Sequence, residues 1–160
     1  MNQYNFKNNI LRLKVKKAPL IFRAIIFFCA SAFFVLPVIG VIFDIAFGGS
    51  LNIGHFIGVG VFYVIGFYVL RVFLWNTYGN ETIEILENKI IYEANYGWFK
   101  GGRTEMEITS PAYSFKSVGY EEDNEAVLVI SSENAQMESV VKMPIDEIKA
   151  LLRILDPVLV

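Results

Sequence analysis

Cysteine and histidine are nearly absent from this chain, which has one of each in 160 residues. Cys29 has no partner within the chain, so a disulfide framework is excluded. With His55 as the only imidazole, neither a Ser-His-Asp nor a Cys-His catalytic set is indicated, and the sequence shows no spacing of metal ligands. We therefore predict no catalytic residue, no metal site and no cofactor, and we expect that the protein is not an enzyme.

Acidic residues are scarce in the first half of the chain only. Residues 1–75 hold seven Lys or Arg and one acid, Asp44, whereas residues 76–160 hold seven Lys or Arg against fifteen Asp or Glu. The two halves are thus expected to face different surroundings. Neither half has the basic balance of a nucleic-acid-binding domain, so no nucleic acid partner is predicted.

Charge is missing altogether from two long stretches. Residues 24–43 are twenty uncharged residues, enough for a helix of roughly 30 Å across the hydrocarbon of a bilayer. Residues 56–70 are also uncharged, and this run lengthens to a full span if the Arg71 side chain reaches the interface. We predict two transmembrane helices, at about residues 20–45 and 53–75, with Pro37 producing a local kink.

Basic residues are absent between the two spans, at residues 44–55, while six precede or enter the first span. The positive-inside rule then predicts a multi-pass protein of the plasma (inner) membrane with both termini in the cytoplasm. Asp44 and His55 flank the outer turn. An interfacial or paired polar role is favoured for them, with proton or metal chemistry as the alternative.

Gly54 and Gly58 form a G-x-x-x-G motif on the second span. Small residues at this spacing permit close contact between helices. Packing against the first span is the favoured interpretation, and a dimer face is the alternative.

Beyond Gly79 the hydrophobic period changes to two, which predicts strands. Six or seven strand-like runs follow, and then an amphipathic helix at about 145–156. We predict an α+β membrane protein with three parts: a basic segment at 1–17, a helical hairpin at 18–76, and a cytoplasmic β domain at 77–160. The acids Glu121, Glu122, Asp123 and Glu125 are interpreted as a solvated turn in preference to a cation site.

The chain has two apolar spans, a W-N-x-x-G-N-E junction at residues 75–81, a strand meander and a terminal helix, in that order. In this order of elements it resembles the bacterial pleckstrin-homology-like (PH-like) membrane proteins. The resemblance implies an antiparallel PH-like β-barrel or sandwich capped by the C-terminal helix, and a membrane location. It implies no catalytic residue.

The stretch "YGWFKGGR" combines aromatic rings with positive charge in an otherwise acidic domain. Trp98, Phe99, Lys100 and Arg103 are candidates for contact with the bilayer surface. The favoured alternative is that both rings pack in the domain core and that both cations are ordinary strand-edge charges.

The N-terminal stretch "LRLKVKK" alternates apolar and basic residues, which fits a short strand better than a helix. A plain basic flank beside the membrane is the favoured interpretation. The alternative is a strand that adds to an edge of the β domain.

These observations lead to a non-enzymatic, membrane-anchored interaction or scaffold module. Its β domain would bind a protein partner or a second copy of the chain at the inner leaflet, with the lipid bilayer as the other partner. Two alternatives stay open: an immunity protein that protects against a toxin acting at the membrane, and a carrier that binds lipid or a small ligand in the β domain.

Overall fold

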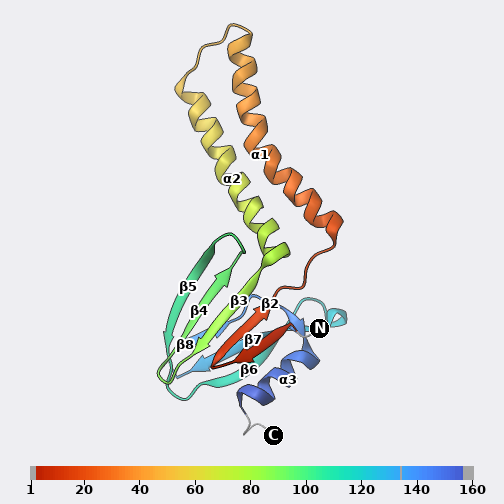
Figure 1. The fold of residues 1–160 in the computed structure, drawn as a ribbon, viewed down its shortest axis with the longest axis vertical. Helices are drawn as coiled ribbons and strands as arrows, with labels where there is room; N and C mark the ends of the chain where they lie inside the picture. The colour runs from red at the N-terminus through yellow and green to blue at the C-terminus, as the bar shows by residue number, and fades with distance from the viewer. Residues whose placement is uncertain (1–2, 134, 157–160) are drawn as a thin grey trace. The chain divides into compact units, whose positions relative to one another are not determined.

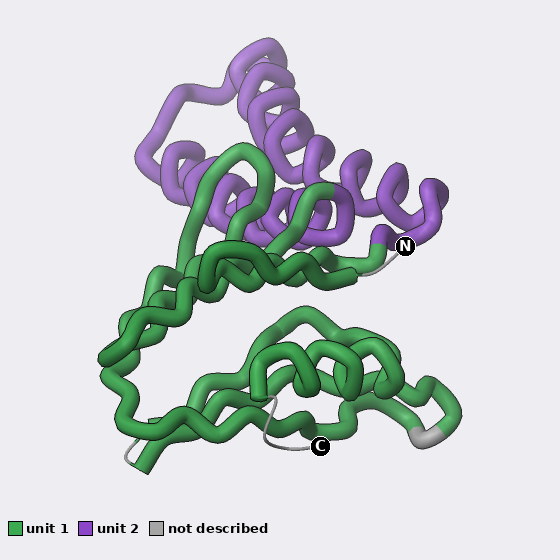
Figure 2. The backbone as a smooth tube through the Cα atoms, turned by 60° about the horizontal axis from the view of Figure 1, so that its bottom comes forward, with its two compact units in different colours: residues 1–16, 78–160 green, residues 17–77 purple. Residues whose placement is uncertain are grey.

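The computed structural model describes residues 3–133 and 135–156 and divides into two compact units. The helical unit comprises residues 17–77, and the β unit comprises residues 1–16 and 78–160 (Figures 1 and 2). The β unit is therefore assembled from two separate segments of the chain. The helical unit is an insertion between them.

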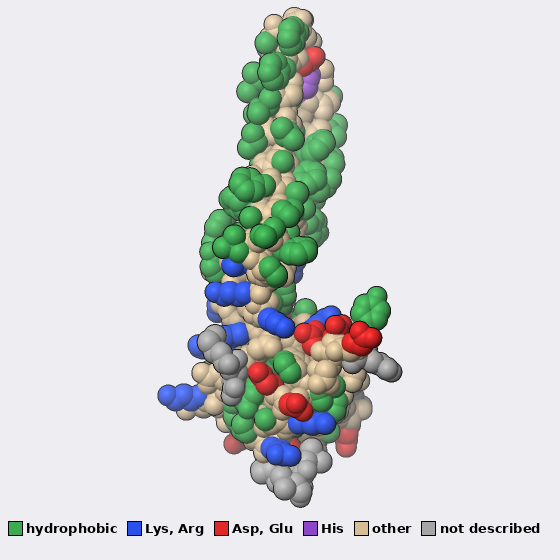
Figure 3. Space-filling model, turned by 90° about the vertical axis from the view of Figure 1, so that its right-hand side faces the viewer, with side chains coloured by type: hydrophobic (Ala, Val, Ile, Leu, Met, Phe, Trp, Pro, Cys, Tyr) green, Lys and Arg blue, Asp and Glu red, His purple; other side chains and the backbone are tan. Residues whose placement is uncertain are grey.

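The helical unit is a hairpin of two long helices, α1 (Leu20–Ala46) and α2 (Ile53–Tyr78). Both are long and apolar enough to cross a membrane, with mean hydropathies of 2.7 and 2.1 and only 6% and 11% of their most apolar windows buried. Many large hydrophobic side chains are exposed along both helices, and Figure 3 shows them on one face of the hairpin. Aromatic pairs join the two helices, including Phe27 with Phe73, whose ring centroids lie 5.2 Å apart.

The β unit contains nine strands and one regular α-helix within the described residues. The strands are β1 (Tyr4–Lys7), β2 (Ile10–Lys14), β3 (Asn80–Ile85), β4 (Lys89–Asn95), β5 (Lys100–Glu107), β6 (Ala112–Val118), β7 (Glu125–Ser132), β8 (Ala135–Glu138) and β9 (Met143–Pro144), and the helix is α3 (Ile145–Leu155). The expected order of two apolar helices, antiparallel strands and a C-terminal helix is thus present, as an α+β fold.

The first sheet has the strand order β1-β2-β3-β4-β5 with every pair antiparallel. The first two strands are joined by a two-residue turn, in which Asn8 and Asn9 have φ of 52° and 60°. Asparagine tolerates this left-handed conformation, and two such residues in succession give the turn twist that hairpins prefer.

The favoured interpretation of the N-terminal segment as a plain basic flank is wrong. Strand β2 pairs with β3 from Ile10↔Glu84 to Lys14↔Asn80. Leu11 and Leu13 are fully buried, because alternation sends them to the inner face of the sheet and the basic residues to the outer face. Residues 4–14 therefore belong to the β domain, and the boundary predicted at residue 77 omits two of its strands.

The second sheet has the order β6-β7-β8, with β9 pairing to the other end of β7. Helix α3 packs against β6, β7 and β9, and Figure 2 shows the two sheets as two layers of the β unit. Within the described ranges the sheets do not close into a barrel, so the barrel expectation is corrected to two packed sheets.

Both sheets and α3 contribute fully buried aliphatic side chains to the core. Examples are Ile83 and Ile90 in the first sheet, Leu128 and Ile130 in the second, and Leu151 in α3. Burial of such residues is the main stabilising contribution of the unit.

Candidate functional site

One end of the first sheet collects both connections to the helical unit. The register places Lys14 opposite Asn80, Asn80 opposite Asn95, and Asn95 opposite Lys100. Just beyond this row, the Val15 N–H donates to the Gly79 carbonyl over 3.1 Å. We call this end of the strands, together with the β4–β5 turn at residues 96–99, the junction end of the sheet.

The β4–β5 turn holds Trp98 out of the core. The Tyr96 N–H donates to the Phe99 carbonyl over 2.9 Å, and the Tyr96 and Phe99 rings stack with centroids 4.8 Å apart. Gly97 adopts φ +89°, and its N–H donates to Asn95 Oδ1 over 2.8 Å. Trp98 is 70% exposed on this turn. The core interpretation is thus wrong for Trp98, whereas Phe99 is half-buried against Tyr96.

The turn also lies against the last residue of α2. A Cβ atom added to Gly97 would come within 2.7 Å of the Tyr78 Cβ. Glycine is required here both by this contact and by its positive φ. The turn therefore has a fixed position beside the point where the chain enters β3.

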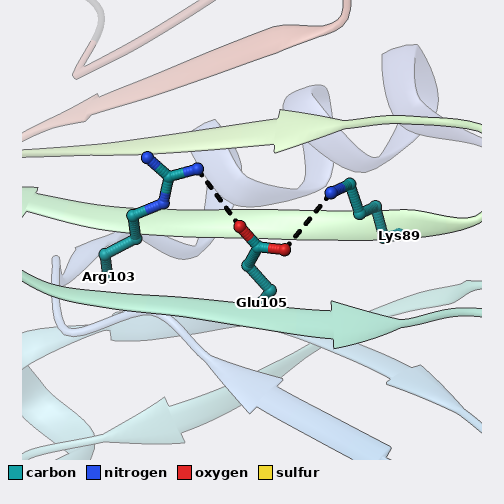
Figure 4. A network of polar contacts seen from close by, with 3 residues as sticks. All are labelled: Lys89, Arg103 and Glu105. Carbon is teal, nitrogen blue, oxygen red and sulfur yellow. Dashed lines mark hydrogen bonds and ion pairs between the residues drawn. The ribbon is translucent and has the colours of Figure 1, made fainter.

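The two cations of this stretch both have acidic partners. Lys100 Nζ lies 2.7 Å from Glu93 Oε2, and Arg103 lies 3.1 Å from Glu105, which also binds Lys89 at 3.2 Å (Figure 4). Hydrogen bonds from Lys89 and Arg103 lower the pKa of Glu105. Trp98, Phe99 and Lys100 are thus brought together at the turn. Arg103 belongs to an ion-pair network farther along β5.

A buried carboxylate links the two sheets. Glu81 of β3 is fully buried, and its Oε1 accepts hydrogen bonds from Tyr92 Oη (3.0 Å), Val140 N (2.7 Å) and Val141 N (3.2 Å). The two valines lie between β8 and β9 of the second sheet. The Glu81 Oε2 atom is buried without a hydrogen-bond partner among the described residues.

Burial raises the pKa of Glu81, and the three hydrogen bonds lower it by less. Burial, and then the charge of Glu81, also raise the pKa of Tyr92. A proton on Oε2 would remove the cost of burying a charge, since an unpaired carboxylate is poorly tolerated in a core. Glu81 was not among the predicted site residues. Its burial could have been inferred from the sequence, because Glu81 is two residues before the buried Ile83 and so lies on the same face of the strand.

Asp44 and His55 come together where α1 and α2 are connected. His55 Nε2 lies 3.2 Å from Asp44 Oδ2, and His55 Nδ1 accepts the Asn52 N–H over 3.2 Å. Both imidazole nitrogens therefore have partners within the turn. This is the paired polar arrangement that the sequence favoured. Arg71 is half-buried near the other end of α2.

The glycine motif does not make the predicted contact between the helices. A Cβ atom on Gly58 would meet nothing within 4 Å, and one on Gly54 would meet only Asn52 Oδ1 at 3.0 Å. Both line a hollow of about 300 Å³ together with Pro37 and Gly40. The close approach occurs at Gly66 instead, where an added Cβ would lie 3.0 Å from Phe33 Cβ. Gly54 and Gly58 therefore face this hollow and make no close contact with α1 in the structure.

The acidic stretch after β6 forms a short turn. Residues Glu121–Asp123 make one turn of 3-10 helix, the Tyr120 N–H donates to Asp123 Oδ2 over 3.1 Å, and Asn124 has φ 49°. Glu122 and Asp123 are exposed. Among the described residues, no group of three or more His, Cys, Asp or Glu side chains is placed to hold a metal ion.

Three comparisons with known proteins found no similar protein. The chain matches no protein-family model, no curated protein and no solved structure.

Proposed function

We propose that the protein is a non-enzymatic, membrane-anchored interaction module. Its two apolar helices span the plasma membrane, and its β unit presents a binding surface at the cytoplasmic leaflet. The observation that carries this proposal is the pairing of β2 with β3, the strands that precede and follow the helical hairpin. Because both strands belong to one folded unit, both ends of the hairpin must lie on the same side of the membrane.

The fold of the β unit supports a PH-like module as the finer description. It has two antiparallel sheets and a C-terminal helix that buries Ile148 and Leu151 against the second sheet. A fold of this kind hosts many functions, so the function must be argued from a surface.

The surface that fits a protein partner is the outer edge of β5. This strand is eight residues long, has a neighbour on one side only within the first sheet, and exposes most of its side chains. An edge strand can accept a strand from another chain by main-chain hydrogen bonding. The partner would be a protein segment or β5 of a second copy.

Site-specific photocrosslinking in cells tests the proposal. A photoreactive residue at Thr104 on β5 should give an adduct with one protein or with a second copy. The matched control places the same residue at Asn88, which is exposed in the β3–β4 turn. If Thr104 yields only the uncrosslinked chain under all growth conditions, or the same adducts as Asn88, β5 is not the binding edge and the proposal fails. Adducts with lipid alone would favour the lipid-binding alternative.

A further inference from the structure

The junction end of the first sheet concentrates exposed positive charge in a unit that is acidic as a whole. The β unit has eleven Lys or Arg against fifteen Asp or Glu, a balance of −4. At this end the exposed charged residues are Lys14, Lys16 and Lys100. Glu93 is the nearby acid, and it is only half-exposed and paired with Lys100. Lys14 and Lys16 thus place positive charge on a unit whose net charge is negative.

The same end carries the indole of Trp98 on a rigid support. The stacked Tyr96 and Phe99 rings and the hydrogen-bonded turn fix the backbone, so the 70% exposure of Trp98 results from an ordered structure. An exposed tryptophan beside lysines is the combination found where proteins meet lipid headgroups. The indole can lie at the apolar boundary while its N–H remains hydrated.

Connectivity keeps this end near the membrane. Asn80, in the row that contains Lys14 and Lys100, is two residues beyond Tyr78, the last residue of α2. Lys16 is four residues before Leu20, the first residue of α1. If both helices span the bilayer, as the proposed function requires, the row is held within a few residues of the headgroups on both sides.

We propose that the junction end of the first sheet binds the anionic lipid headgroups of the cytoplasmic leaflet. Trp98 inserts among the headgroups, and Lys14 and Lys16 contact their phosphates, with Lys100 at the rim. Arg103 takes no part, because it lies three residues farther along β5 in the network with Glu105 and Lys89. The contact fixes the orientation of the β unit on the membrane.

Tryptophan fluorescence of the full chain in lipid nanodiscs tests this assignment. The Trp75→Phe variant retains Trp98 as the only tryptophan. Nanodiscs of phosphatidylcholine, with or without phosphatidylglycerol, carry some lipid brominated in its acyl chain as a quencher. We expect Trp98 emission to shift to the blue and lose intensity when phosphatidylglycerol is present. The control chain carries Trp75→Phe, Trp98→Phe and Asn88→Trp. Its tryptophan lies at the opposite end of β3 and β4, roughly 24 Å from Asn95 at about 3.4 Å per residue, and should stay unquenched.

Charge variants separate headgroup recognition from simple proximity. In the Trp75→Phe background, Lys14→Gln with Lys16→Gln should abolish the response to phosphatidylglycerol. The matched pair Lys116→Gln with Lys149→Gln should keep it, since these lysines lie on β6 and α3. Equal quenching in neutral and anionic bilayers, or a Lys14/Lys16 variant that behaves like its parent, overturns the assignment. Trp98 emission typical of water in both bilayers also overturns it.

Failure of this inference can be told apart from failure of the proposed function. Accessibility of a cysteine at Ser50 from outside the cell reports whether the hairpin spans the membrane. If the hairpin spans the membrane but Trp98 is in water, the proposal of a membrane-anchored module stands and only the proposed lipid contact fails.

Discussion

At the residue scale, Glu81 is the position where local pattern and chemistry disagree most. Its place in β3 is that of a core residue, yet its side chain is ionisable. The structure accommodates it by directing two backbone donors and a tyrosine hydroxyl to one oxygen. The donors come from the second sheet and from β4, so this side chain joins segments that are distant in sequence.

Stability should therefore depend on pH through Glu81. Its folded pKa is raised above the ordinary value of 4.5, so the folded chain holds a proton that the unfolded chain has released. The unfolding free energy is then greatest below the unfolded pKa and falls as pH rises through the folded pKa. Glu81→Gln keeps the acceptor oxygen and removes the titration, so it should flatten this decline of stability at pH values above 4.5.

Urea unfolding of the detergent-solubilised chain at a series of pH values measures the effect. Glu84→Gln is the matched control, since Glu84 lies in the same strand but outside the core and should leave the profile unchanged. Glu81→Leu leaves the Val140 and Val141 donors without their acceptor and should lower stability by about 1–3 kcal/mol. Identical pH profiles for the parent and Glu81→Gln would show that Glu81 does not titrate as proposed.

At the element scale, α3 covers the second sheet with one face. Ile148 and Leu151 are fully buried, whereas Leu152 is half-buried and Ile154 is 49% exposed. Ile148, Leu151, Leu152 and Leu155 recur at helical spacing on one face of α3, and the buried centre of that face is Ile148 with Leu151. We expect the helix to stabilise the β unit mainly through these two residues.

Leu151→Ala should lower the unfolding free energy by about 2–5 kcal/mol, because truncation of a fully enclosed leucine loses apolar contacts and creates a cavity. Ile154→Ala in the same helix should cost less than about 0.5 kcal/mol. Trypsin digestion of the solubilised chain distinguishes them. Equal resistance of the two variants would mean that α3 is not needed to hold the second sheet together.

The helices and most strands could be predicted from sequence because they depend on local periodicity and on runs of apolar residues. The pairing of β2 with β3 could not, since Lys14 and Asn80 are separated by the whole helical hairpin and no local pattern records a partner at that distance. The exposure of Trp98 could not be predicted from the sequence either, because it depends on the stacking of the Tyr96 and Phe99 rings in the same turn. Glu81 was recognisable only as an acid in an inward-facing position.

At the scale of the whole molecule, the helical hairpin is an insertion in the sequence of the β unit. The Val15 N–H to Gly79 carbonyl contact closes the insertion at its base. Lengthening a connection between neighbouring strands costs free energy only logarithmically, so a long insertion is compatible with a stable sheet. The unit should tolerate removal of the insertion.

A chain that joins residues 1–15 to residues 79–160 through Asn-Gly should fold as a water-soluble β unit, since two residues can connect adjacent antiparallel strands. Residues 79–160 alone should not, because they lack the β2 strand with its buried Leu11 and Leu13. Amide exchange and the dispersion of NMR signals compare the two. A well-folded 79–160 fragment would contradict an essential role for β2.

The proposed topology, with the β unit in the cytoplasm, is tested by cysteine labelling. With Cys29 replaced by Ser, a cysteine at Ser50 should react with an impermeant maleimide in intact cells. A cysteine at Asn88 should react only after the membrane is opened. Labelling of Asn88→Cys in intact cells would place the β unit outside and contradict the cytoplasmic orientation.

The divided β unit also imposes an order on protein synthesis. Strand β2 leaves the ribosome before either apolar helix, and its sheet partner β3 follows only after both helices have been made. At ordinary elongation rates this interval is about 3–13 s, during which Leu11 and Leu13 have no sheet to cover them. In the proposed membrane-spanning arrangement, the nascent chain inserts its hairpin before the sheet around β2 is complete. Insertion of the hairpin would then be a step in the folding of the β unit, because β3 is made only after the hairpin.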